Sequence, residues 1–159
     1  MQENRIGPFV MKTMVLAALT ALLPFSSPAL AQDDEPATWS IAIHGGAGTL
    51  DPDAMTPERR AAYEAALQQA LDAGKAVLAS GGSAMDAVKA AVVLLEDIPL
   101  FNAGRGSVYT WDETIEMDAS IMDGRDRSAG AVAGVNTIRN PILLADEVRT
   151  QSEHCLLYT

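Results

Sequence analysis

An apolar run over residues 39–43 ends at a histidine and a turn dense in glycine. The run, which contains Trp39, Ile41 and Ile43, predicts a buried β-strand. His44 follows it, and the loop then has glycine at three positions, Gly45, Gly46 and Gly48. Glycine allows backbone conformations that are closed to other residues, so the loop is a candidate functional site. The alternative is a tight turn that leaves a central strand.

Two helices are predicted after this loop. Thr56 and Pro57 are a strong helix start, and apolar residues at spacings of three and four predict a helix to about Ser80 that packs on one side only. A glycine pair ends it. Ser83 then caps a second helix to about Glu96, which is apolar almost all round and should be more deeply buried.

The second half of the chain predicts strands and one more helix. A compact loop over 99–106 precedes expected strands at 107–109, 114–122 and 128–135. Asp123 and Gly124 form a pair that is typical of a hairpin turn. Asn140 and Pro141 should cap a last helix to about Gln151, and residues 154–158 are apolar enough to open another strand.

The first 31 residues have the layout of a secretory signal. Lys12 precedes an apolar stretch over 14–23, and Ala29 and Ala31 form an A-x-A cleavage site. We expect cleavage after Ala31, an exported (periplasmic or secreted) product over 32–159, and Met11 as a possible true start. The alternative is a membrane anchor, but a spanning helix needs about 20 apolar residues, so no membrane association is expected.

Charge and cysteine content narrow the classes of function. The net charge of −10 argues against nucleic acid as a partner, because phosphates require Lys and Arg. The single cysteine, Cys155, allows no internal disulfide, and its apolar neighbours favour packing over a nucleophilic role. Two histidines, His44 and His154, without a Cys pair or an HExxH spacing make a zinc site improbable.

Other motifs fit structural roles better than catalytic ones. The glycine-rich G-x-G-x-x-G pattern fails at Asp51 and again at Tyr109, and a serine nucleophile elbow fails at Met85. Asp118 and Asp123 are five residues apart in strand-like sequence, which fixes no catalytic geometry, so we interpret both as structural. His44 could act as a base, but a histidine that holds a glycine loop by hydrogen bonds is the preferred interpretation.

Four blocks, in this order, resemble the isoaspartyl peptidase/plant-type L-asparaginase family. They are IAIHGGAG at 41–48, LLEDIPLFNAGRGSV at 94–108, EMDASIMDG at 116–124 and GAVAGVNTIRNPILLA at 130–145. The resemblance implies an N-terminal nucleophile hydrolase with an αββα sandwich, present here as its N-terminal half. It also implies a precursor that cuts itself before a threonine, and two fragments that assemble as a dimer of heterodimers.

The resemblance also assigns a supporting site. It implies that the loop of His44, Gly45, Gly46 and Gly48 adjoins the cleavage site and that Asn102 points toward the nucleophile, with a loop-stabilising amide as the alternative for Asn102. It implies a structural sodium ion held by backbone carbonyls, those of Leu95, Glu96, Ile98, Phe101, Ala103 and Arg105. The nucleophilic threonine should lie downstream of Thr159, so we expect this chain alone to be inactive.

The sequence therefore predicts the N-terminal part of a hydrolase that acts on isoaspartyl dipeptides and asparagine. One alternative is a non-catalytic truncated product or binding module that kept half of the fold. A glycosylasparaginase-like amidase is a closer alternative, because it shares the type of nucleophile.

Overall fold

The structure is a computed structural model that describes residues 38–46 and 54–158. The expected signal segment, Gly48 and Thr159 lie outside the described residues. The elements, in chain order, are α1 (Pro57–Ala79), α2 (Ala84–Asp97), the 3-10 helix η1 (Gly104–Gly106), β1 (Met117–Met122), β2 (Ala129–Val135), α3 (Pro141–Gln151) and β3 (Leu156–Tyr158).

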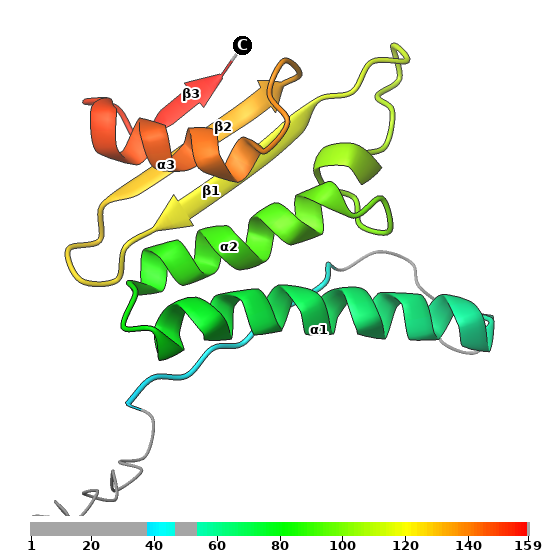
Figure 1. The fold of residues 1–159 in the computed structure, drawn as a ribbon. Helices are drawn as coiled ribbons and strands as arrows, with labels where there is room; N and C mark the ends of the chain where they lie inside the picture. Colours follow the sequence, from blue (N-terminus) through cyan, green and yellow to red (C-terminus); the bar gives the residue numbers. More distant parts are fainter. Residues whose placement is uncertain (1–37, 47–53, 159) are drawn as a thin grey trace, which may run out of the picture. The chain divides into compact units, whose positions relative to one another are not determined.

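The three strands form one sheet in the order β1-β2-β3 (Figure 1). β1 and β2 are an antiparallel hairpin, in which Met122 pairs with Ala129. β2 and β3 are parallel, because α3 carries the chain back between them. The predicted hairpin is confirmed, but its turn spans residues 123–128, and the positive φ lies at Arg127 (64°) rather than at Gly124.

One of the predicted strands is replaced by a single bridge. Residues 107–109 form no strand; Tyr109 makes an isolated antiparallel bridge with Ile115, and β1 begins only at Met117. Thr110 and Thr114 close the intervening turn, since the Thr110 N–H donates to the Thr114 carbonyl at 2.8 Å. The two threonine hydroxyls also lie 2.8 Å apart, so this segment closes a turn instead of extending the ladder.

A bulge in β2 gives Asp118 its role. The register shifts between Met117 and Ala119, opposite Gly134, whose φ is +69°. The Gly134 N–H donates to the Asp118 side chain at 2.9 Å. Asp118 is therefore structural, as predicted.

Helices α2 and α3 cover one face of the sheet, and the core lies between these helices and the sheet. Figure 1 shows α3 in front of β2 and α2 beside β1. The core is made of buried residues from both helices and the sheet, namely Met85, Ile121, Val132, Val135, Ile142, Ala145 and Val148. α1 packs on the other side of α2 through Ala66, Ala70 and Gly74, so its one-sided burial is confirmed.

Local capping chemistry explains where the first two helices begin. The Arg59 N–H donates to the Thr56 hydroxyl at 3.2 Å, and the Asp86 N–H donates to the Ser83 hydroxyl at 3.1 Å. Ser83 is thus a helix cap, as predicted. Asn140 occupies the cap position of α3 but makes no side-chain cap bond there.

The first predicted strand is wrong. Residues 39–43 form no strand in the structure, although Trp39, Ile41 and Ile43 are half-buried and their neighbours are exposed. The alternation of a strand is present, but a strand also needs hydrogen bonds from a neighbour, and the described sheet offers none here. Ile41 instead lies against Gly74 of α1. No helix in the described part of the chain is long and apolar enough to span a membrane.

Candidate functional site

The histidine at the start of the glycine loop bonds within its own loop. The Gly46 N–H donates to Nδ1 of His44 at 3.2 Å, and Gly46 has a φ of +110°, which favours glycine. His44 is exposed. A hydrogen bond from the loop to this histidine, as predicted, is therefore present at Gly46.

Gly45 brings this segment against the second predicted loop. A Cβ at Gly45 would lie 2.9 Å from the Leu67 side chain and 3.3 Å from the Phe101 ring. The backbone at Gly45 is therefore packed between α1 and the loop over residues 98–106. The structure thus brings together Gly45 and Phe101, two predicted site residues that are distant in sequence.

The loop over residues 98–106 folds tightly on itself. Gly104 has a φ of +53°, and a Cβ there would overlap the carbonyl oxygen of Glu96. A Cβ at Gly106 would overlap the Phe101 carbonyl oxygen. Both glycines are required because the backbone approaches too closely for any side chain.

α1 fixes this loop from its other side. The Tyr63 hydroxyl donates to the Leu100 carbonyl at 2.8 Å. The Tyr63 and Phe101 rings meet edge to face, with centroids 5.6 Å apart. A single tyrosine of α1 thus holds two successive loop residues.

Asn102 is exposed and bonded within the same region. Its Oδ1 accepts a hydrogen bond of 3.0 Å from the Val108 N–H. This bond stabilises the exit of the loop, which is the alternative role considered for this amide. A role of Asn102 toward the nucleophile stays a prediction.

Glu96 carries the buried charge of the region. It is 3% exposed, and its Oε1 accepts a 2.9 Å hydrogen bond from the Ile142 N–H in the first turn of α3. Its Oε2 is buried without a hydrogen-bond partner in the described part of the chain. Burial raises the pKa of the Glu96 carboxyl, while the bond from Ile142 and the Asn140 amide act in the opposite direction.

Asp97 ties the same helix end to the segment before α3. Arg139 donates to both Asp97 oxygens, at 2.9 and 2.8 Å, and the Asn140 amide donates to one of them at 3.3 Å. The Arg139 guanidinium is the main cause that lowers the pKa of the Asp97 carboxyl. Asn140 was predicted to cap α3, but its amide is used by Asp97, and Glu96 caps the helix instead.

The loop offers oxygen donors of the kind that a hard cation prefers. Two of the six predicted sodium-binding carbonyls, those of Ile98 and Ala103, accept hydrogen bonds from Phe101 and Gly106. The Glu96 and Phe101 carbonyls lie where a Cβ on Gly104 or Gly106 would reach them. A sodium ion held by these carbonyls, together with those of Leu95 and Arg105, stays a prediction.

Two other candidate residues have their roles set by contacts elsewhere. The Asp123 carboxylate accepts hydrogen bonds from the Arg125 side chain and backbone in the β1–β2 turn, so its structural role is confirmed. Cys155 was expected to pack, but it is exposed. Only its carbonyl joins the sheet, where it accepts from the Ala131 N–H at 2.7 Å.

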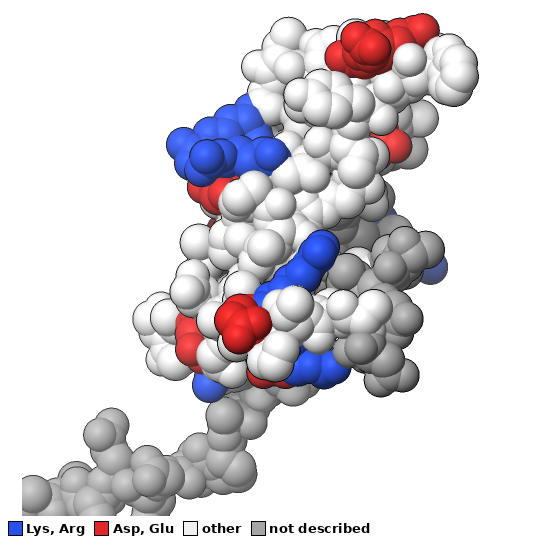
Figure 2. All heavy atoms as spheres, turned by 90° about the vertical axis from the view of Figure 1, so that its right-hand side faces the viewer, with Lys and Arg blue, Asp and Glu red and all other residues white. Residues whose placement is uncertain are grey.

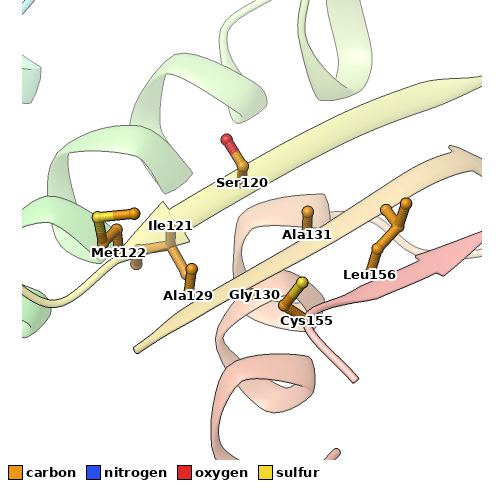
Figure 3. Close-up of a pocket in the computed structure, with 8 residues that line it drawn as sticks. All are labelled: Ser120, Ile121, Met122, Ala129, Gly130, Ala131, Cys155 and Leu156. Carbon is orange, nitrogen blue, oxygen red and sulfur yellow. The ribbon is translucent and has the colours of Figure 1, made fainter. Parts of the chain in front are cut away.

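The face of the sheet opposite the helices carries a shallow hollow of about 290 Å³. Figure 3 shows Ser120, Ala131, Cys155 and Leu156 around it, from all three strands or their ends. It contains none of the predicted site residues. Figure 2 shows another face, with one acidic group at its upper end and smaller basic and acidic groups interspersed below it.

Comparison with known proteins shows the family to which this chain belongs. The family model described as asparaginase matches residues 37–159. The chain therefore belongs to the asparaginase family, whose members are N-terminal nucleophile hydrolases. The layer of helices on a sheet is a partial α/β arrangement in keeping with that class.

Similar proteins carry the names of hydrolases. The chain is 50% identical over 117 residues to the isoaspartyl peptidase of Escherichia coli, and this match covers 74% of this chain and 36% of that protein. It is 49% identical over 117 residues to a putative isoaspartyl peptidase/L-asparaginase of Dictyostelium discoideum (74% and 34%). It is 48% identical over 118 residues to the human isoaspartyl peptidase/L-asparaginase (74% and 37%). The chain spans about a third of the length of these relatives.

The side-chain role of Glu96 was missed by sequence reasoning. The resemblance assigned Glu96 only a backbone carbonyl ligand. The available signal was a glutamate at the end of an apolar stripe, in the segment VVLLED over residues 92–97. A charged residue on a buried face needs a partner, but its partner, Ile142, is 46 residues away.

Proposed function

We propose that this chain is the N-terminal part of a self-processing amidohydrolase that hydrolyses β-aspartyl (isoaspartyl) dipeptides and L-asparagine. The identity of 48–50% to isoaspartyl peptidases and asparaginases carries this proposal. The matched region contains both loops that meet at Gly45 and Phe101. The proposed function is supported because the family resemblance assigns these same two loops to the active site.

The nucleophile in this proposal is an N-terminal threonine in a segment downstream of Thr159. Its α-amine, which titrates at about 7.7 to 8.0, takes the hydroxyl proton near neutral pH. In this scheme, the described chain contributes residues that surround the nucleophile and does not contribute the nucleophile itself. His44 and its glycines shape the loop beside the cleavage point, and Asn102 is presented toward the nucleophile.

Assembly, ion and location belong to the same proposal. The uncovered face of the sheet packs on the second sheet of an αββα sandwich, and two such heterodimers associate. A sodium ion bound by the six carbonyls of the 95–105 segment stiffens the loop.

Residues 1–31 direct export of the protein. N-terminal sequencing of the protein recovered from outside the cytoplasm tests this, and Gln32 should be the first residue.

The decisive experiment uses the complete coding sequence. The expressed protein should separate into two fragments, the second beginning with threonine, and should release aspartate from β-aspartyl-leucine and from asparagine. Replacing that threonine with alanine should abolish both cleavage and hydrolysis. The proposal fails if the unsubstituted protein is folded yet remains one chain without hydrolysis.

Two controls separate the alternatives. The chain over 32–159 alone should be inactive; if it is monomeric, melts cooperatively and the complete protein hydrolyses nothing, the non-catalytic alternative is favoured. Preferential cleavage of a glycosylated asparagine over both other substrates would favour a glycosylasparaginase-like amidase.

A further inference from the structure

Glu96 contacts two parts of the fold that are far apart in sequence. Its carboxylate accepts the Ile142 N–H at 2.9 Å, at the start of α3. Its carbonyl oxygen and Cβ lie against the Cα of Gly104, in the loop over residues 98–106. One residue is therefore bonded to α3 through its side chain and packed closely against the loop through its backbone.

This side chain replaces a cap that α3 lacks. The first N–H groups of a helix have no acceptor within the helix and need one from outside. Asn140, at the cap position, makes no such bond. Glu96 supplies the acceptor from the end of α2, and the neighbouring Asp97 holds Arg139 and Asn140. Two consecutive carboxylates thus fasten the segment that leads into α3.

Stability alone is a poor reason for this arrangement. Glu96 is 3% exposed, and one of its oxygens is buried without a partner in the described residues. A buried charge generally loses more hydration than it regains in contacts, but it can fix one specific arrangement of the elements around it. The arrangement it fixes here is the position of the loop relative to α3.

We infer that Glu96 is a positioning residue, whose carboxylate fixes the loop over residues 98–106 against the start of α3 and so places Asn102. The part that concerns Asn102 and the reaction rests on the proposed function. The part that concerns the loop stands on the hydrogen bond to Ile142 and the contact with Gly104.

Limited digestion of the full chain with trypsin tests the loop. Arg105 is an exposed cleavage site in the loop, and Arg127 is an exposed site in the β1–β2 turn that serves as an internal reference. Glu96→Ala should raise cleavage after Arg105, relative to Arg127, by about tenfold, because a buried hydrogen bond to a charged group is lost and the loop opens locally. Glu96→Gln keeps an acceptor for Ile142 and should restore the ratio to within about twofold of the unsubstituted chain. The matched control is Glu116→Ala, at an exposed glutamate.

Three outcomes would overturn the inference. Equal acceleration at Arg105 and Arg127 would show general destabilisation. Acceleration confined to Arg149 in α3 would show that Glu96 caps the helix without holding the loop, and an unchanged ratio would show no role at all. If Glu96→Ala does not fold, Glu96→Asp shortens the side chain by one methylene and is expected to raise the same ratio.

The complete protein separates this inference from the proposed function. Glu96→Ala should lower kcat about tenfold or more with a smaller change in KM, and Glu96→Gln should rescue it, because the reacting groups are misplaced while substrate contacts remain. If the unsubstituted protein hydrolyses nothing while the trypsin result holds, the proposed function fails and the loop inference stands. If the loop opens but kcat is unchanged, the inference that Glu96 positions Asn102 for the reaction is wrong.

Discussion

At the scale of single residues, Gly104 is one of two positions in the loop over residues 98–106 where the backbone leaves no space for a side chain. Its φ is +53°, and an added Cβ would overlap the Glu96 carbonyl oxygen. We expect Gly104→Ala to lower the free energy of unfolding by about 2 kcal/mol or more, from backbone strain and the displaced loop. Urea unfolding measures it.

The control for this change is Gly124→Ala in the β1–β2 turn. A Cβ at Gly124 meets nothing within 4 Å, and its φ is not positive. Its free energy of unfolding should stay within about 1 kcal/mol of the original chain. Equal losses for the two variants would contradict the tight packing at Gly104.

Asp123 is the residue whose charge state should matter in acid. Hydrogen bonds from Arg125 hold the pKa of the Asp123 carboxyl at about 2, below the value of about 3.9 usual for an unfolded chain. The stabilisation is therefore present above about pH 4 and lost as the pH falls toward 2. The difference in Tm between the unsubstituted chain and Asp123→Asn should shrink over this range.

Thermal melts between about pH 6 and pH 2 measure this effect. Asp112→Asn, at an exposed turn residue, removes one carboxylate without the Arg125 contact and is the control. Because the Arg125 side chain is 81% exposed, high salt should reduce the difference at neutral pH. A difference that stays constant down to pH 2 would exclude the proposed linkage.

At the scale of elements, Gly130 sets how closely α3 lies on the sheet. A Cβ there would overlap the Ala145 carbonyl oxygen and the Arg149 backbone nitrogen. Gly130→Ala must push α3 off β2, so we expect the free energy of unfolding to fall by about 2 to 3 kcal/mol. Chemical denaturation followed by circular dichroism gives the value.

Its neighbour supplies a control of the same size. Ala131 faces the hollow on the uncovered side of the sheet (Figure 3), so Ala131→Ser also adds one heavy atom to β2. That variant should change the free energy of unfolding by about 0.5 kcal/mol or less. A loss as large as that of Gly130→Ala would mean that crowding by α3 is not the cause.

The elements that local sequence specifies are the ones that could be predicted. Thr56 and Ser83 bond to groups three residues away, so the starts of α1 and α2 are visible in the sequence. The strand expected at residues 39–43 was wrong, because a ladder depends on a partner strand that local sequence does not show. The cap of α3 by Glu96 joins groups 46 residues apart, and no local pattern contains it.

The same distinction holds at the candidate site. The histidine bond to Gly46 spans two residues and was predicted from the loop itself. The meeting of Gly45 with Phe101, and the grip of Tyr63 on Leu100, depend on how α1 crosses the loop. Sequence therefore indicated which loops matter, while their mutual placement needed the fold.

At the scale of the whole molecule, the bare side of the sheet should govern self-association. Met122, Leu156 and Tyr158 are 61%, 48% and 76% exposed, and β3 is an edge strand of the described sheet. Contiguous apolar surface beside an open edge favours pairing with other copies of the chain. We expect the chain over 32–159 to associate as its concentration rises.

Leu156→Lys tests that expectation, because a charge on the edge strand opposes pairing. Leu156 makes no part of the core between the helices and the sheet, so the variant should keep its Tm while light scattering shows less association. Leu143→Lys is the control, at a similarly exposed leucine (43%) on α3, away from the sheet edge, and should leave association unchanged. If both lysine variants reduce association equally, general charge repulsion is the cause, and the bare sheet face is not the surface through which copies meet.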